Sequence, residues 1–210
     1  MNDGTLLVYD STAVDIDPEK LNFTRLDLDN LNLHLSARLE PANNDIRTKL
    51  KKLSFRDINS GFRLKKFSVN TNVNKSGLKI NELNFESDNS RVNLSASLKN
   101  VNVFDTTAVK NSGNAKISAD INIEKISPKD LNLIPRLPFK LGQDVSISSS
   151  ISGRLDSISL DKFDLSSDNT SLSLSGMFKN IQDTNKISYA AKFNTTQIHY
   201  SELDDILPAQ

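Results

Sequence analysis

Apolar and polar residues alternate with a period of two along most of this chain. Between residues 31 and 39, every second position is Leu or Ala, and Asn, His, Ser and Arg fill the positions between them. The same alternation recurs in residues 92–98, 117–123, 145–151, 172–178 and 187–193. Because successive side chains of a strand point to opposite faces, each segment predicts a strand with one apolar and one polar face. Strands buried on both faces would carry continuous apolar runs, so the pattern favours an all-β chain with antiparallel pairing.

One short sequence pattern occurs three times, at uneven spacing. The copies are DNLNLHLSARL (29–39), DNSRVNLSASL (88–98) and DNTSLSLSGMF (168–178). Each begins with Asp-Asn, and each follows a shorter stretch of alternating apolar residues. Asp and Asn tolerate left-handed backbone and bond to their own main chain, which suits hairpin turns. Each copy therefore predicts a β-hairpin that turns at Asp-Asn.

A second pattern lies between the predicted hairpins and indicates short helices. It reads IDPEKL (16–21), ISPKDL (126–131) and IHYSEL (198–203). Asp17-Pro18 and Ser127-Pro128 are typical of a helix N-cap followed by its first residue, and Asp130 occupies the position of a capping-box acid.

The whole chain is thus predicted to be an elongated antiparallel sheet with short helices between its groups of strands. A sheet of this length does not stay flat, so we expect it to coil and curl around its apolar face. We treat residues 1–210 as one continuous segment, with repeat-like units at approximately 14–75, 76–135 and 143–208.

Composition and charge exclude several classes of function. The 210 residues contain no Cys and no Trp, and 26 Lys and Arg balance 26 Asp and Glu. The absence of Cys rules out disulfides and thiolate metal sites. No basic run suggests a nucleic-acid partner. No phosphate-binding Gly loop, nucleophile elbow or zinc motif appears, so we expect neither enzymatic activity nor a metal or other cofactor.

No segment has the length and apolarity of a membrane span, and the N-terminal residues lack the features of a signal peptide. We therefore expect the chain to be an internal piece of a longer protein. The unpaired edges of such a piece offer a route to dimerisation.

The sequence resembles the TamB-like branch of the AsmA-like envelope proteins, the translocation and assembly module family of Gram-negative bacteria. The segments that carry the resemblance are LSFRDINSGFRLKKFSV (53–69), LKINELNFESDNSRVNLSASL (78–98), ISPKDLNLIPRLP (126–138), ISGRLDSISLDKFDLSSDNTSLSLSGMFKNIQD (151–183) and LDDILP (203–208). They are most similar to homologues of the Bacteroidetes and Chlorobi type.

The resemblance implies a periplasmic location, with the full-length protein anchored in the inner membrane. It also implies a β-taco, a curled sheet with an apolar groove that carries phospholipids between the inner and outer membranes. Phospholipid acyl chains would then be the ligand, and the outer-membrane assembly machinery a further partner. We predict that the groove is lined by Val92, Leu94, Leu98, Ile117, Ile121, Val145, Ile147, Ile151, Leu172, Leu174, Phe178, Ile187 and Phe193.

Three alternatives compete with a lipid groove. The chain would act as a scaffold or chaperone for outer-membrane proteins if it offered its sheet edges for β-augmentation. It would form an adhesin-like array if the same residues filled closed sandwich cores. For any single residue of the predicted lining, filling an ordinary core is an equally good interpretation.

Overall fold

The computed structural model describes residues 2–10, 20–105, 113–134, 141–181 and 185–199. These residues form one antiparallel sheet of eleven strands, in which each strand pairs with its neighbours in the sequence. The strands are β1 (Gly4–Tyr9), β2 (Arg25–Glu40), β3 (Asp45–Asp57), β4 (Arg63–Asn74), β5 (Gly77–Ser87), β6 (Arg91–Lys99), β7 (Lys116–Ile126), β8 (Val145–Arg154), β9 (Ser157–Ser166), β10 (Ser171–Lys179) and β11 (Ser188–Gln197). The predicted all-β antiparallel class is confirmed.

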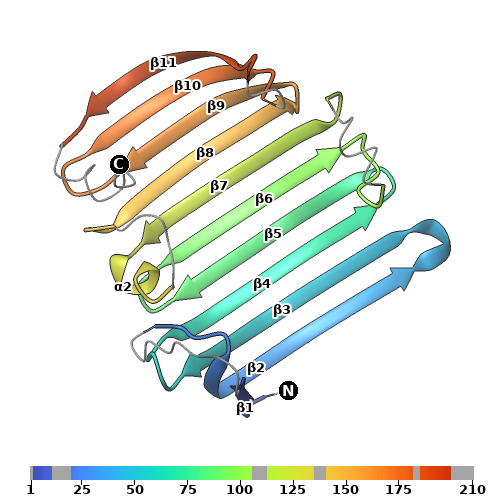
Figure 1. The fold of residues 1–210 in the computed structure, drawn as a ribbon, viewed down its shortest axis with the longest axis vertical. Coiled ribbons are helices and arrows are strands. Elements are labelled where there is room, and N and C mark those ends of the chain that lie inside the picture. Colours follow the sequence, from blue (N-terminus) through green and yellow to red (C-terminus); the bar gives the residue numbers. More distant parts are fainter. Residues whose placement is uncertain (1, 11–19, 106–112, 135–140, 182–184, 200–210) are drawn as a thin grey trace.

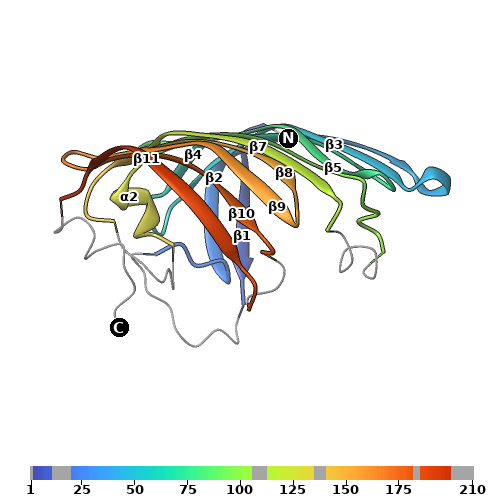
Figure 2. The same ribbon diagram turned by 90° about the horizontal axis from the view of Figure 1, so that it is seen from above.

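The sheet is open and curved. Strands β1 and β11 lie at its two opposite edges (Figure 1). Seen along the sheet, the strands form an arch, and the short helix α2 (Pro128–Leu131) lies beneath it on the concave side (Figure 2). Among the described residues there is no second sheet facing this concavity, so they do not form a closed sandwich.

Every pair of neighbouring strands contains a shift in register. Six stretches at these shifts share one sequence pattern, in which two apolar residues of a strand are separated by two polar ones. The stretches are LDNL (28–31), LKKL (50–53), LKKF (64–67), INEL (80–83), IEKI (123–126) and LDKF (160–163). In each, the three-residue step pairs with a two-residue step of a neighbouring strand, which defines a β-bulge. Bulges bend and twist a sheet, so these shifts account for part of the arch.

Two of the three predicted hairpin turns are confirmed. The chain reverses between β5 and β6, where the Ser87 amide donates to the Ser90 carbonyl at 3.0 Å. It reverses in the same way between β9 and β10, where the Ser167 amide donates to the Thr170 carbonyl at 2.9 Å.

The third predicted turn, at Asp29-Asn30, is wrong. These residues lie inside the continuous strand β2, where Asn30 adopts a φ of 50° and the register with β3 shifts. The tolerance of Asn for left-handed backbone is therefore used here for a bulge and not for a chain reversal.

The short helix predicted in residues 126–131 is confirmed as α2, with Pro128 at its first position. The predicted capping role of its acid is wrong, because the Ser127 amide, which a capping-box acid would bind, donates to the Ser90 hydroxyl. The Asp130 carboxylate instead accepts hydrogen bonds from the β5–β6 turn. Residues 11–19 and 200–210, which hold most of the other two predicted helices, lie outside the described residues.

Gly77 begins β5 in a conformation that other residues rarely adopt. Its φ is 144°, and a Cβ at this position would lie 1.9 Å from the Leu98 carbonyl oxygen. We expect Gly77→Ala to lower the free energy of unfolding by about 3 kcal/mol or more, since strain and a backbone clash add together. Gly61 is the matched control, because its φ is 72° and nothing lies within 4 Å of a Cβ there. Gly61→Ala should cost only about 1 kcal/mol in the same urea titration, and equal losses would contradict the clash.

Candidate functional site

Apolar side chains form continuous rows across the concave face. Residues paired directly across neighbouring strands point to the same side of a sheet, so each row can be followed through the register. One row contains Leu53, Phe67, Phe85, Val92, Ile123, Ile147, Leu165 and Leu172. The next contains Leu35, Leu50, Val69, Leu83, Leu94, Ile121, Ser149, Phe163, Leu174 and Phe193. Phe67, Phe85 and Val92 line a cavity together with Leu131 of α2, which places the rows on the concave side.

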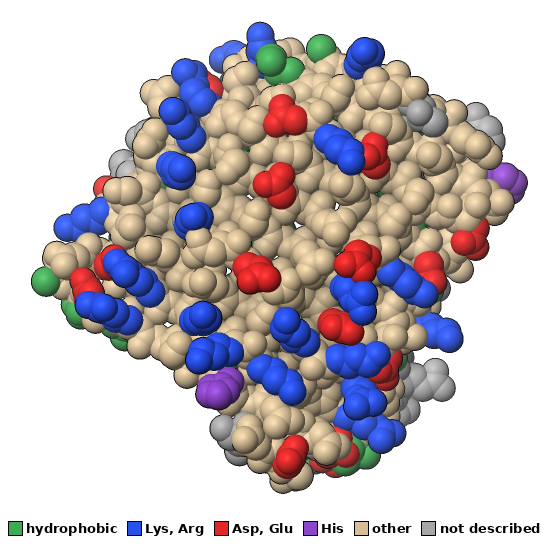
Figure 3. All heavy atoms as spheres, turned by 180° about the vertical axis from the view of Figure 1, so that it is seen from behind, with side chains coloured by type: hydrophobic (Ala, Val, Ile, Leu, Met, Phe, Trp, Pro, Cys, Tyr) green, Lys and Arg blue, Asp and Glu red, His purple; other side chains and the backbone are tan. Residues whose placement is uncertain are grey.

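The opposite, convex face is polar. Its rows combine Ser, Asn, Lys and acidic residues, as in the series Ser68, Asn84, Asn93, Asn122, Ser148, Asp164 and Ser173. Figure 3 shows this face covered with charged and uncharged polar side chains, with hydrophobic side chains only near its margins. The concave face of the sheet is thus apolar and the convex face is polar, as the alternation of residues predicted.

The structure brings most of the predicted lining residues together. Eleven of them lie in apolar rows of the concave face: Val92, Leu94, Leu98, Ile117, Ile121, Ile147, Ile151, Leu172, Leu174, Phe178 and Phe193. Val145 pairs with Ile126, which also lines the cavity, and it is 7% exposed. Ile187 lies just before β11 and outside any described strand, and it is 45% exposed. Their contact with lipid stays a prediction.

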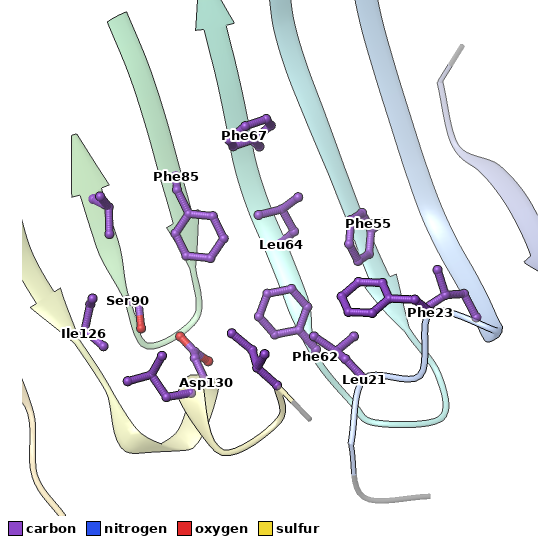
Figure 4. Close-up of a pocket in the computed structure, with 14 residues that line it drawn as sticks. Leu21, Phe23, Phe55, Phe62, Leu64, Phe67, Phe85, Ser90, Ile126 and Asp130 are labelled. Carbon is purple, nitrogen blue, oxygen red and sulfur yellow. The ribbon is translucent and has the colours of Figure 1, made fainter. Parts of the chain in front are cut away.

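A cavity of ≈ 410 Å³ lies on the concave face. Strands β3, β4 and β5 supply its floor, Leu21 and Phe23 lie on one side, and Ile126 and Asp130 lie on the other (Figure 4). Its lining is aromatic and aliphatic apart from Ser90 and Asp130.

The side chains around this cavity differ widely in exposure. Leu21, Phe62 and Leu64 form a buried cluster, and the rings of Phe55 and Phe62 lie 6.1 Å apart. Phe23 is 65% exposed and therefore marks the mouth. The cavity is thus a mainly apolar space that opens to the concave side.

A buried polar network holds α2 over the cavity. Asp130 is 8% exposed, and its carboxylate accepts hydrogen bonds from the Ser87 hydroxyl and from the Asn89 side-chain amide, the latter at 3.0 Å. The Ser90 hydroxyl accepts the Ser127 amide at 3.1 Å. The Ser-Asp-Asn-Ser turn that reverses the chain therefore also anchors the next helix.

The later copy of this turn makes an equivalent bond. There the Thr170 hydroxyl accepts the His199 amide at 3.2 Å, just after β11. Ser127 and His199 each follow the Ile of the second repeated pattern, in residues 126–131 and 198–203. The two repeated patterns are therefore linked by a hydrogen bond in both places.

Most of the cavity floor was missed by the analysis of alternation. Phe55, Leu64 and Phe67 lie on strands β3 and β4, which do not alternate strictly because bulges interrupt them. The available signal was the spacing of three between apolar residues, as in LKKL (50–53) of β3 and LKKF (64–67) of β4. A search for alternating strands that allowed one bulge would have found both strands.

Comparison with protein-family models, curated proteins and solved structures gives no match for this chain. Within the described residues, no helix has the length and apolarity to span a membrane. The same part of the chain holds no cluster of His, Cys, Asp and Glu suited to a metal ion.

We expect Asp130→Ala to release α2 from the sheet. The change leaves Ser87 and Asn89 without their partner, so the free energy of unfolding should fall by about 2 kcal/mol. Hydrogen exchange at residues 127–134 should accelerate.

Asp88→Ala is the matched control for this change. Asp88 lies in the same turn, but its ion pair with Lys65 is exposed and should contribute less than about 1 kcal/mol. If Asp88→Ala destabilised α2 as strongly as Asp130→Ala, the network would not be what holds the helix.

Proposed function

We propose that this chain carries phospholipid acyl chains on its concave face, as a periplasmic segment of an envelope protein that moves lipids between the inner and outer membranes. The observation that carries the proposal is the extent of the apolar rows, one of which runs from Leu35 of β2 to Phe193 of β11 with Ser149 of β8 as its one polar member. Neighbouring strands are about 4.8 Å apart, so eleven strands extend the surface over roughly 45–50 Å.

The energetics of such a surface suit a mobile apolar ligand. Each CH₂ group that leaves water contributes about 0.8 kcal/mol, and this contribution needs no directed polar contact. Successive rows offer similar side chains, so an acyl chain has similar free energy at neighbouring positions and can move between them. Polar head groups would remain in water at the open side of the arch.

The exposure of the concave face also favours a ligand. Leu35, Leu39 and Phe193 are 56%, 64% and 62% exposed, although all three lie in apolar rows. Extended apolar surface of this kind is uncommon on monomeric soluble proteins and marks sites of interaction. An acyl chain would cover it without requiring a second protein layer.

Charges placed within one apolar row test the proposal. We expect Leu94→Asp combined with Leu174→Asp to weaken the binding of a fluorescent phospholipid at least tenfold and to remove co-purified phospholipid from native mass spectra. The reason is that both carboxylates would have to be desolvated beneath an acyl chain.

The matched control is Asn93→Asp combined with Ser175→Asp, which adds the same charge on the convex face of the same two strands. It should change binding less than threefold. If the Asp variants of Leu94 and Leu174 fail to fold, Thr at both positions retains strand propensity and should still weaken binding severalfold. Unchanged lipid binding by a folded Thr variant would contradict the proposal.

A second candidate function is supported by the free edge of β11. Among the described residues this strand pairs with β10 alone, and its Tyr189 is 74% exposed. An open edge offers unpaired backbone groups to an added strand, so this segment would suit β-augmentation by an unfolded outer-membrane protein.

Photo-crosslinking distinguishes the two candidate functions. A photoreactive residue replaces Tyr189 at the edge or Leu98 in the interior of the concave face. On the lipid proposal, we expect both positions to crosslink to phospholipid in the cell envelope. Crosslinks to protein from position 189 alone, with no lipid at either position, would favour the scaffold.

A further inference from the structure

Strands β3 and β4 carry two chemically different surfaces. Phe55 pairs with Leu64, and both line the cavity on the concave side. The adjacent residues Arg56 and Arg63 pair with each other, so their side chains lie together on the convex side. The same strands that form the apolar floor therefore place cations on its reverse.

Positive charge is concentrated on these two strands, although the whole chain is neutral. Their basic residues are Arg47, Lys49, Lys51, Lys52, Arg56, Arg63, Lys65 and Lys66, and their acidic residues are Asp45 and Asp57. Asp57 is 1% exposed and accepts hydrogen bonds from the Asp27 and Ser60 amides, so it lies away from the surface. In Figure 3, Lys and Arg gather over the lower part of the convex face, which β3 and β4 cross.

Several cations on the rest of the sheet are paired with acids. Arg91 pairs with Glu124 at 2.9 Å and with Glu86 at 3.2 Å, and hydrogen bonds to these carboxylates raise its pKa above the ordinary value. Lys162 and Arg154 are likewise paired, with Asp164 and Asp156.

Six of the cations on β3 and β4 lack such partners. Among the described residues, no acid forms an ion pair with Lys49, Lys51, Lys52, Arg56, Arg63 or Lys66, and all six are exposed. Their charges are therefore not neutralised within the sheet.

Three of the unpaired cations line a polar hollow of ≈ 620 Å³. Lys52, Arg56 and Arg63 line it together with Lys65, and the Asp3 and Asp88 carboxylates also contribute. Asp88 is engaged by Lys65 at 3.1 Å. Positive charge consequently dominates around the hollow and extends along both strands.

We propose that this surface, defined by Lys52, Arg56, Arg63 and the neighbouring cations of β3 and β4, docks on an anionic phospholipid bilayer. Clusters of exposed Lys and Arg bind anionic head groups, and each cation near the surface strengthens binding roughly fivefold. Phe55 and Phe67 line the cavity on the other side, and although Phe55 also borders the hollow, its ring lies 6.1 Å from that of Phe62. The surface therefore offers distributed charge without the stacking platforms that single-stranded nucleic acid requires.

The docking surface is independent of the lipid-carrying face. It requires no apolar contact, so it should discriminate by head-group charge and be sensitive to salt. Acyl-chain binding on the concave face requires no net lipid charge. A neutral phosphatidylcholine vesicle and a vesicle containing phosphatidylglycerol therefore separate the two activities.

Vesicle flotation tests the docking surface. We expect the chain to float with vesicles of phosphatidylcholine containing about one third phosphatidylglycerol, and not with pure phosphatidylcholine. Replacing Lys52, Arg56 and Arg63 with Gln should weaken this binding about a hundredfold, given roughly fivefold per cation. Binding by the unmodified chain should be lost near 1 M salt, where the Debye length falls to about 3 Å.

The matched control replaces Arg91, Arg154 and Lys162 with Gln, which removes the same positive charge from residues that are already paired. It should bind anionic vesicles within about threefold of the unmodified chain, with an unchanged circular dichroism spectrum.

Three results would overturn the proposal. One is an equal loss of binding in both variants, and another is equal flotation with neutral vesicles. The third is tighter binding of poly-glutamate or a single-stranded oligonucleotide than of anionic vesicles at the same charge concentration.

Discussion

The cross-strand register is the constraint on which the structure depends. A one-residue slip moves every side chain of a strand to the opposite face, so two distinct faces survive only if all neighbouring pairs keep apolar residues opposite one another. The row from Leu53 through Phe85 and Ile147 to Leu172 shows that they do. Because the concave face has no second sheet among the described residues, this register, and not a closed core, organises the sheet.

The bulges reconcile this register with curvature. In LKKL, INEL and LDKF, a step of three residues would reverse the side-chain direction in a regular strand. The bulge adds one residue to the strand, and this extra residue keeps the apolar side chains on the same face. Ile80 therefore pairs with Ala96 and Leu83 with Leu94, and all four point to one side. The same device recurs at Leu160 and Phe163, which indicates that bending at this position belongs to the repeated unit.

The sequence was sufficient to predict an element where a local pattern forms only one kind of structure. Strict alternation located the strands that contain Val92, Ile121 and Leu172, and Pro128 located α2. The sequence was insufficient where one pattern can form either of two structures. Asp-Asn makes a turn at residues 88–89 but a bulge in β2, and the choice depends on whether β3 is long enough to pair on both sides of Asn30. The partner of Asp130 is set by the turn at Ser87, which no local pattern around α2 reveals.

The apolar pattern recurs along the whole concave face, but the exposure of its side chains varies. At the α2 end, Phe62 and Leu64 are 8% and 5% exposed beneath a helix fixed by Asp130, whereas Tyr189 and Phe193 at the β11 edge are 74% and 62% exposed. Since apolar stabilisation scales with the area removed from water, a hydrocarbon chain would be held more tightly under α2 than at β11. A gradient of affinity for hydrocarbon would then follow from one helix placed over part of a repeating sheet. The cations of β3 and β4 lie behind the same part of the sheet, so the apolar cavity and the densest positive charge share two strands.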